Sequence, residues 1–236
     1  MVFDPSFATS ILPLLVDAAI TTVRISVLSF LGACTFGVLI SALRRVSNRN
    51  GKRGIALVTD FIRMTPVLIQ VFFLYFWLPE IGIALSPFET GVLALSLHYG
   101  CYLAEVFRAG LEGVDRGQWD ALRSLSVPSY AAYRYVILPA AIRPILPAAG
   151  NYLILMFKET PVLASISVTE MLFVSSQIGA EQFRYTEPVT ICGCLFLIMS
   201  VSSGWVVRRL EAALARNLAK SNSPNAVGDV SGPQAV

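Results

Sequence analysis

Charged residues are scarce in this sequence. They make up 14% of its 236 residues, whereas a soluble domain carries roughly 25%. The apolar residues gather in long uncharged runs, of which Ile25–Leu43 and Pro188–Val207 are the clearest. Each run approaches the roughly 20 residues that cross about 30 Å of hydrocarbon as a helix. This pattern excludes an ordinary soluble domain and predicts an integral membrane protein.

Motifs of catalytic and nucleotide-binding sites are missing from the sequence. There is no Gly-x-x-x-x-Gly-Lys-Ser/Thr phosphate loop, no His-Glu-x-x-His motif and no Gly-x-Ser-x-Gly motif. The single histidine, His98, is expected to be a hydrogen-bonded core residue. The cysteines lie in apolar stretches without the paired spacing of a metal or redox centre. The chain is therefore not expected to be an enzyme, to hydrolyse ATP or to bind a cofactor itself.

The apolar segments predict an all-α protein with about five transmembrane helices. Helix is the required form because backbone polar groups in lipid must be satisfied within the segment. The predicted helices cover residues 15–43, 55–78, 88–111, 139–158 and 186–207. Residues 15–210 then form the transmembrane domain, after an external segment at 1–14. Residues 211–236 are expected to form a disordered cytoplasmic tail, because they offer little to bury.

Lysine and arginine predict the orientation of these helices. Most of the 18 basic residues fall in the link between the first two helices, in the link between the third and fourth, and in the tail. The opposite links contain glutamates and a single basic residue, Arg184. Because cytoplasmic loops carry the excess of Lys and Arg, the N-terminus is predicted outside and the C-terminus in the cytoplasm.

The link between the third and fourth helices contains a short amphipathic segment. Helical spacing places four apolar residues on one side: Trp119, Leu122, Leu125 and Val127. Pro128 ends this helix, and Ser126 is expected to cap the helix that follows. A short amphipathic helix on the cytoplasmic side is suited to docking into a groove of another protein.

This segment resembles the cytoplasmic signature of the permease subunits of binding-protein-dependent ABC importers. That signature is Glu-Ala-Ala, three residues, Gly, nine residues, Ile, one residue, then Leu-Pro. The matching positions here are Asp120, Ala121, Leu122, Ser126, Val136, Leu138 and Pro139. Leu122 for Ala and Ser126 for Gly are the larger departures. If Ser126 cannot adopt the turn that Gly allows, the local geometry must differ from the family's.

The resemblance implies an ABC importer type I permease fold with a coupling segment at residues 112–138. In the family this segment fits a cleft of the ATPase subunit, which assigns ATPase coupling to Gly117, Gln118, Trp119, Asp120, Ala121, Leu122, Ser126, Leu138 and Pro139. The implied partners are a cytoplasmic ABC ATPase dimer that binds ATP and Mg, a second permease subunit, identical or homologous, and an extracytoplasmic solute-binding protein. The implied location is the bacterial inner membrane.

Further segments resemble the polar amino acid uptake branch of that family, of the histidine and glutamine type. They are Arg63–Gln70, which reads Arg-x-Thr-Pro-x-x-x-Gln, the stretch Tyr102–Gly110, and Asn151 with Phe157–Thr160. Within the branch, three stretches are similar to permeases for ectoine and hydroxyectoine: Leu97–Tyr99, Phe157–Pro161 and Phe183–Pro188. The resemblance therefore implies a zwitterionic solute.

Polar and charged residues within the apolar helices are candidates for the solute pathway. They are Arg63, Thr65, Gln70, Lys158, Glu159 and Thr160. Adjacent Lys158 and Glu159 could present complementary charges to a zwitterion, or form a structural ion pair at a helix break. Arg63 and Gln70 either line the pathway or hydrogen-bond to neighbouring helices.

Two further features have a structural interpretation. Glu105 and Arg108, at i and i+3, are expected to form an ion pair. The aromatic run Phe72–Trp77 is expected to lie in an interfacial belt or to pack against other helices.

The predicted function is the permease subunit of an ATP-driven importer for polar amino acids or a related zwitterion such as ectoine. The chain would form the translocation pathway and couple to separate ATPase subunits. The alternative is a secondary transporter driven by an ion gradient, which would not need the cytoplasmic docking segment.

Overall fold

Residues 3–221 are described in this computed structural model, with side chains through residue 213, and every element within that range is helical. In chain order the elements are α1 (Pro5–Val46), α2 (Arg49–Met64), α3 (Val67–Trp77), η1 (Leu78–Ile81), α4 (Pro87–Glu112), α5 (Arg116–Ser124), α6 (Ser129–Ala132), η2 (Tyr133–Ile137), α7 (Leu138–Glu159), η3 (Thr160–Ile166), α8 (Met171–Gln182) and α9 (Thr186–Ser221). The all-α prediction is confirmed.

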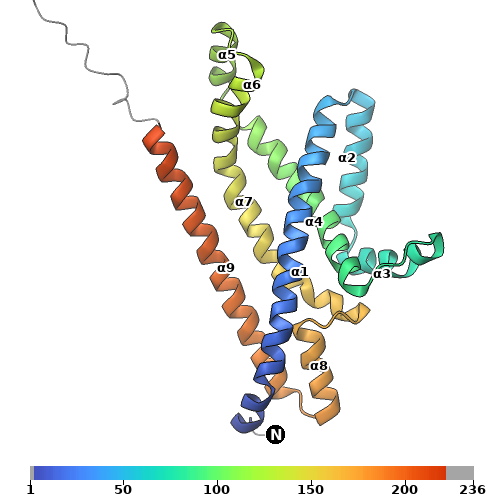
Figure 1. Cartoon of the computed structure of the whole chain (residues 1–236). Coiled ribbons are helices and arrows are strands. Elements are labelled where there is room, and N and C mark those ends of the chain that lie inside the picture. The colour runs from blue at the N-terminus through green and yellow to red at the C-terminus, as the bar shows by residue number, and fades with distance from the viewer. Residues whose placement is uncertain (1–2, 222–236) are drawn as a thin grey trace, which may run out of the picture.

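The long helices α1, α4, α7 and α9 form an elongated bundle (Figure 1). Its main core lies where α4 packs against α1, α3 and α7, and includes the fully buried residues Ile25, Leu95 and Leu103. Small residues allow the helices to approach closely, as in other membrane bundles. A Cβ atom at Gly37 of α1 would lie 3.0 Å from the Leu103 Cβ and 3.1 Å from the backbone nitrogen of Ala104 in α4.

The prediction of one helix over residues 55–78 is wrong, because the structure has two helices in this part of the chain. α2 and α3 meet at Thr65 and Pro66 with an angle of 101° between them. Proline lacks a backbone N–H and disfavours helical backbone in the residue before it. Thr65 is accordingly extended, with φ −89° and ψ 135°. As a result, α3 and η1 project sideways from the bundle as an arm (Figure 1).

Three helical segments are long and apolar enough to cross a membrane: Pro5–Val46, Ser129–Ile166 and Thr186–Ala213. The bent pair α2 and α3 makes a fourth if it counts as one span. α4 does not meet that criterion, although it has the length to span, so the number of five crossings stays a prediction.

Several predicted boundaries differ from the structure. α1 begins at Pro5, ten residues before its predicted start, because the Asp4 carboxylate caps it by accepting from the backbone N–H groups of Ser6 and Phe7. α9 continues to Ser221, so the first part of the predicted disordered tail is helical. The rest of that tail, residues 222–236, lies outside the described residues.

The short helix α8 is absent from the predicted set of helices. The carboxylate of Glu170, which is fully buried, caps α8 by accepting from the backbone N–H groups of Leu172 and Phe173 at 2.9 and 2.7 Å. The backbone N–H of Met171 also donates to the Thr22 hydroxyl of α1 at 3.3 Å. The bond to Thr22 ties the start of α8 to α1. Burial raises the pKa of Glu170 to about 7.

The start of α1 is held by an ion cluster at the end of the molecule that is predicted to lie outside. The Arg184 guanidinium contacts the carboxylates of Asp4 at 3.3 Å and Glu187 at 2.6 Å, and it stacks on the Phe7 ring at 4.5 Å. The backbone N–H of Asp4 donates to Glu187 as well, at 3.0 Å. Arg184 and Glu187, which belong to the ectoine-like stretch, therefore have a structural role that is independent of any solute.

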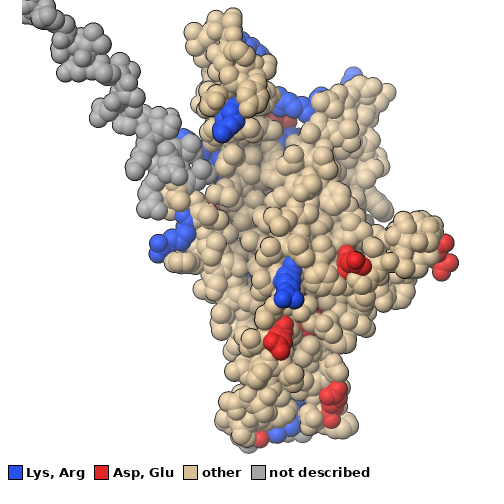
Figure 2. Space-filling view, viewed as in Figure 1, with Lys and Arg blue, Asp and Glu red and all other residues tan. Residues whose placement is uncertain are grey.

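Basic and acidic side chains are unevenly distributed along the bundle. In Figure 2, most of the visible Lys and Arg side chains lie toward the end that carries α5 and the turn between α1 and α2. Most of the visible Asp and Glu side chains lie in the other half. This segregation agrees with the predicted orientation, which itself stays a prediction.

Replacing Gly37 by valine is expected to destabilise the bundle by about 1–3 kcal/mol, because overpacking a close contact displaces its neighbours. The backbone of Ala104 cannot move aside as a flexible side chain would. Gly193→Val in α9 is the matched control, since a Cβ at Gly193 meets nothing within 4 Å. The midpoints of thermal unfolding in one detergent measure the difference. Equal midpoints for the two variants would contradict the close contact.

Docking of α8 is expected to weaken as the pH rises. A carboxyl whose pKa rises from 4.5 to about 7 on folding binds its proton more tightly in the folded chain. Its contribution to stability is therefore greatest below pH 4.5 and falls as the pH passes 7, by up to about 3 kcal/mol. Hydrogen exchange of the Leu172 and Phe173 amides, corrected for intrinsic rates, measures the effect. Protection that does not depend on pH, or that keeps its pH dependence in Glu170→Gln, would refute it.

Candidate functional site

One candidate site is the hairpin of α5 and α6, which forms one tip of the molecule (Figure 1). α5 begins at Asp115, whose carboxylate accepts from the Gly117 N–H at 2.7 Å. None of the residues of α5 is buried. Gly117, Gln118, Asp120 and Ala121 are all exposed at this tip. The hairpin thus presents a helical surface that has no partner within the described residues.

The other side of α5 holds the hairpin onto the bundle. Trp119 and Leu122 pack onto a cluster that includes the buried residues Val114, Ile137 and Ala141. The Trp119 ring meets the Tyr133 ring edge-on, with centroids 5.6 Å apart. Leu125, in contrast, is 76% exposed, so the predicted apolar side is only partly correct. α5 therefore has an inner face, which packs against the bundle, and an outer face, which is exposed.

Ser126 adopts the turn for which the family signature uses glycine. Its φ is +50°, in the left-handed region. The Ser126 N–H donates to the Arg123 carbonyl at 3.0 Å, and the Val127 N–H donates to the Leu122 carbonyl at 3.1 Å. These two bonds form the Schellman motif that closes a helix C-terminus. Ser126 therefore ends α5, and its predicted role as cap of the next helix is wrong, because Pro128 occupies that position.

The hairpin is connected to the rest of the bundle in two ways. The chain runs from α6 through the π-helical turn η2 into α7, so that Leu138 and Pro139 lie at the start of α7. From α1, Arg45 donates to the Tyr133 hydroxyl, with its guanidinium 5.4 Å from the ring centroid. A displacement of the hairpin would therefore act on both α1 and α7.

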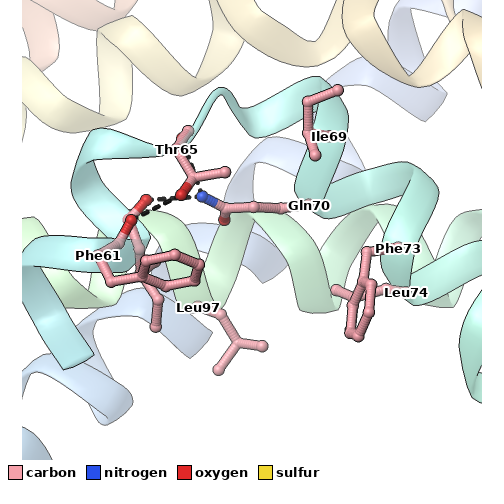
Figure 3. Close-up of a pocket in the computed structure, with 8 residues that line it drawn as sticks. Phe61, Thr65, Ile69, Gln70, Phe73, Leu74 and Leu97 are labelled. Carbon is pink, nitrogen blue, oxygen red and sulfur yellow. Dashed lines mark hydrogen bonds between the residues drawn. The ribbon is translucent and has the colours of Figure 1, made fainter.

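A second candidate site lies at the break between α2 and α3. The Gln70 side chain reaches back across the break toward the last turn of α2 (Figure 3). Its Nε2 donates to the carbonyls of Ile62 at 2.7 Å and Thr65 at 3.0 Å. The Thr65 hydroxyl donates to the Phe61 carbonyl at 2.7 Å. Gln70 and Thr65 thus satisfy backbone and side-chain groups at the break, which supports the structural alternative for both.

His98 of α4 completes this arrangement. It is buried, and its Nδ1 lies 3.1 Å from Nε2 and 3.3 Å from Oε1 of the Gln70 amide. The His98 ring is thus hydrogen-bonded to the Gln70 amide, and the ring tautomer sets which of the two side chains donates. The prediction of a hydrogen-bonded core histidine is confirmed.

A cavity of about 380 Å³ opens beside the break between α2, α3 and α4. It is lined by Phe61, Ile69, Phe73, Leu74 and other apolar residues, with Thr65 and Gln70 as its polar members (Figure 3). Both polar residues already have hydrogen-bond partners. This cavity is therefore apolar and offers no charged group to a zwitterion.

Arg63 faces a cluster of tyrosines from α4 and α7. Its guanidinium lies 4.9 Å from the centroid of the Tyr102 ring, and the Tyr102 hydroxyl donates to the Arg63 carbonyl at 3.0 Å. Tyr102, Tyr99 and Tyr152 form a triangle with ring centroids 5.5 to 6.1 Å apart. The Arg63 guanidinium also approaches Asp60 at 3.5 Å, while its Nε is buried without a partner.

Lys158 and Glu159 point in different directions. The Glu159 carboxylate interacts electrostatically with His98 and Tyr99 of α4. Its Oε2 is buried and accepts no hydrogen bond. Lys158 is exposed and lines a shallow cavity with Phe196 and other residues of α9. No ion pair joins the two among the described residues, so the alternative of a structural ion pair is wrong, because neighbouring residues of a helix do not face each other.

Thr160, the last of the predicted pathway residues, is fully buried at the start of η3. Its hydroxyl donates to the Phe157 carbonyl at 2.9 Å. Because the hydroxyl has a local partner, Thr160 closes the end of α7 and does not join the tyrosine cluster.

The three tyrosines are not among the residues predicted to line the solute pathway. Tyr99 and Tyr102 are three residues apart in α4, a spacing that places them on one face of the helix with His98 beside them. That pattern alone could have identified the α4 part of the cluster. The contribution of Tyr152 could not be predicted, because it depends on how α7 packs against α4.

The predicted pair of Glu105 and Arg108 is confirmed and belongs to a larger network. Arg108 contacts Glu105 at 2.7 Å and Glu112 at 2.5 Å, and Arg44 of α1 also pairs with Glu105. The network joins α1 to the end of α4.

Comparison with known proteins identifies the family. Residues 33–216 match the model of the binding-protein-dependent transport system inner membrane component. A probable amino-acid ABC transporter permease of Sinorhizobium fredii is 40% identical over 211 residues, which cover 89% of this chain and 91% of that protein. The glutamine transport system permease protein GlnP of Escherichia coli is 32% identical over 213 residues, covering 89% and 97%.

A solved structure has the same fold. The crystal structure of an amino acid ABC transporter with histidines matches with a TM-score of 0.83 and 31% identity, over 90% of this chain and 100% of that one. An inward-facing MetNI methionine ABC transporter matches in fold with a TM-score of 0.74, at 17% identity. The alternative of a gradient-driven secondary transporter finds no support in these matches. The chain belongs to the family of binding-protein-dependent transport system inner membrane components, and it is the inner-membrane permease subunit of an ABC importer whose ATPase is a separate subunit.

Proposed function

We propose that this chain carries a polar amino acid or a related zwitterion across the inner membrane, paired with a second permease subunit. The names of the similar permeases support an amino acid as the solute, since they refer to amino acids and to glutamine. None of those names refers to ectoine. Ectoine therefore rests on the sequence resemblance alone, and Arg184 and Glu187 of that stretch already serve in the ion cluster.

The observation that carries the choice of solute is the tyrosine cluster, which has charged groups of both signs next to it. Arg63 lies over Tyr102, and Glu159 interacts with Tyr99. Each has a buried polar atom without a partner, Nε of Arg63 and Oε2 of Glu159. Unsatisfied buried polar atoms are costly, so such atoms suit a ligand that completes them.

An amino acid has the complementary groups. Its carboxylate matches the Arg63 guanidinium, and its ammonium group matches the Glu159 carboxylate. The tyrosine faces add a cation–π surface for the ammonium group. Arg63 and Glu159 thus form the proposed solute contacts, whereas Thr65, Gln70 and Thr160 maintain the helix ends around them and Lys158 faces α9.

The outer face of α5 forms the proposed contact with the ATPase. Gly117, Gln118, Asp120 and Ala121 are exposed there, while Trp119 and Leu122 hold the hairpin to the bundle. Ser126 ends the helix, and Leu138 with Pro139 carries its movement into α7. ATP and Mg²⁺ are bound by the ATPase dimer, and the solute arrives on an extracytoplasmic binding protein.

A second permease subunit would complete the pathway. Exposed apolar residues lie along the arm of α3 and η1, including Phe73, Phe76 and Ile81. Either lipid or another protein chain must cover these exposed apolar faces. One chain with so few membrane spans has too few helices to surround a solute.

Replacing Ala121 by arginine is expected to uncouple transport from ATP hydrolysis. Ala121 lies on the exposed face of α5, where a long charged side chain would prevent close docking without disturbing the core. Import should fall at least about tenfold, which corresponds to a loss of about 1.4 kcal/mol of coupling. Uptake by proteoliposomes measures the change.

The control for this variant is Ala121→Ser, which changes the same exposed position of α5 by one small hydroxyl and should leave uptake at the level of the parent chain. Membrane content and thermal stability should match the parent chain in both variants. Normal uptake by Ala121→Arg would remove the proposed role of α5.

Replacing Glu159 by glutamine is expected to lower the affinity for an amino acid, because the ammonium group loses its counter-charge. Hydrogen bonds to charged groups contribute about 1.5–3 kcal/mol, so we expect import at limiting solute to fall about tenfold or more. Arg63→Gln should act similarly through the solute carboxylate. Transport by the reconstituted importer, with the ATPase rate as a check on assembly, measures both.

Lys158→Gln provides the matched control, since Lys158 is adjacent to Glu159 and faces α9. Its uptake should equal that of the parent chain. If Lys158→Gln impairs import as much as Glu159→Gln does, the tyrosine cluster is not the solute site.

A further inference from the structure

A polar cavity lies at the end of the bundle that is predicted to face the cytoplasm. It has a volume of about 300 Å³ and is formed where α1 ends, α2 begins and α4 ends. Four cationic side chains line it, together with a hydroxyl and one acid: Arg44, Arg45, Lys52, Arg108, Ser41 and Glu112. Nothing in the proposed transport mechanism uses this cavity.

The acids at the cavity do not balance its cations. Arg44 and Arg108 share the Glu105 carboxylate, and Arg108 also binds Glu112. Arg45 binds the uncharged Tyr133 hydroxyl. The Lys52 ammonium group forms no ion pair or hydrogen bond with the described residues and is exposed at the cavity. The positive charges of Arg45 and Lys52 therefore remain available to an anion.

The cavity lies beside surfaces that are suited to lipid. On α1, Leu39 and Leu43 are 58% and 56% exposed, and on α2, Leu57 is 73% exposed. These apolar side chains precede or follow the cationic residues on the same helices. In the predicted orientation, the cavity therefore lies at the level of the lipid headgroups on the cytoplasmic side. Basic pockets between membrane helices on the cytoplasmic side bind anionic headgroups.

We propose that this cavity binds the phosphate ester of an anionic phospholipid of the inner leaflet, with its acyl chains along the exposed leucines of α1 and α2. Lys52 and Arg45 provide the charge, and the Ser41 hydroxyl provides a further donor. The bound lipid would hold the turn between α1 and α2 against the end of α4. Since Arg45 also contacts Tyr133, the site lies next to the α5 hairpin.

The test uses the complete importer in nanodiscs of phosphatidylcholine, with phosphatidylglycerol added in increasing amounts. Native mass spectrometry of the released complex measures how much phosphatidylglycerol it retains. Replacing Lys52 by glutamine should lower the apparent affinity about tenfold, more than the loss of one charge near an anionic surface would produce. Lys52 has no side-chain partner within the described part of the chain, so the variant should fold normally.

Arg53→Gln is the matched control. Arg53 is the next residue of α2, is also exposed and does not line the cavity. It should change retention by no more than about fivefold, which corresponds to the roughly 1 kcal/mol that one basic residue contributes near an anionic surface. Equal losses in the two variants would overturn the proposal in favour of diffuse attraction. Displacement of the lipid by inorganic phosphate would overturn it also, because the site would then belong to a soluble phosphate.

Discussion

The arrangement of α2, α3 and α4 depends on how the protein provides hydrogen-bond partners for the backbone groups at a helix break that lies among apolar neighbours. Backbone carbonyls left free in such surroundings are costly. Pro66 creates the break, and the Gln70 amide donates to two of the carbonyls on the α2 side. His98 then fixes the orientation of that amide. Through these bonds the break determines where Arg63 lies relative to the tyrosines of α4.

The helical fold and the docking segment were predictable because they depend on local patterns. Long uncharged runs predict helices, and the spacing around Ala121 predicts an amphipathic turn. The sequence contains Thr65-Pro66 at the break, but the apolar run continues past it and therefore predicts a single helix over residues 55–78. α8 was missed although the Glu170 carboxylate that caps it bonds only to the N–H groups of Leu172 and Phe173, because α8 is too short to cross a membrane and Glu170 becomes buried only in the packed bundle.

The candidate site was only partly predictable for a related reason. A sequence shows that Lys158 and Glu159 are adjacent, but a helix turns adjacent side chains about 100° apart. Only the packing of α7 between α4 and α9 shows which of the two faces the tyrosines. The tyrosines themselves come from two helices far apart in the chain. Residues on one helix face could be grouped in advance, whereas contacts between helices required the structure.

Ser126 shows what the glycine of the family signature specifies at this position. The requirement is a backbone angle, since a serine with φ +50° forms the same pair of hydrogen bonds. A left-handed conformation costs a residue with a Cβ about 1–2 kcal/mol. The turn at the tip of the hairpin is thus less stable with serine than a glycine would make it, because glycine adopts this angle without that cost. The end of the surface proposed to meet the ATPase is therefore a part of the hairpin whose folded form is only weakly favoured.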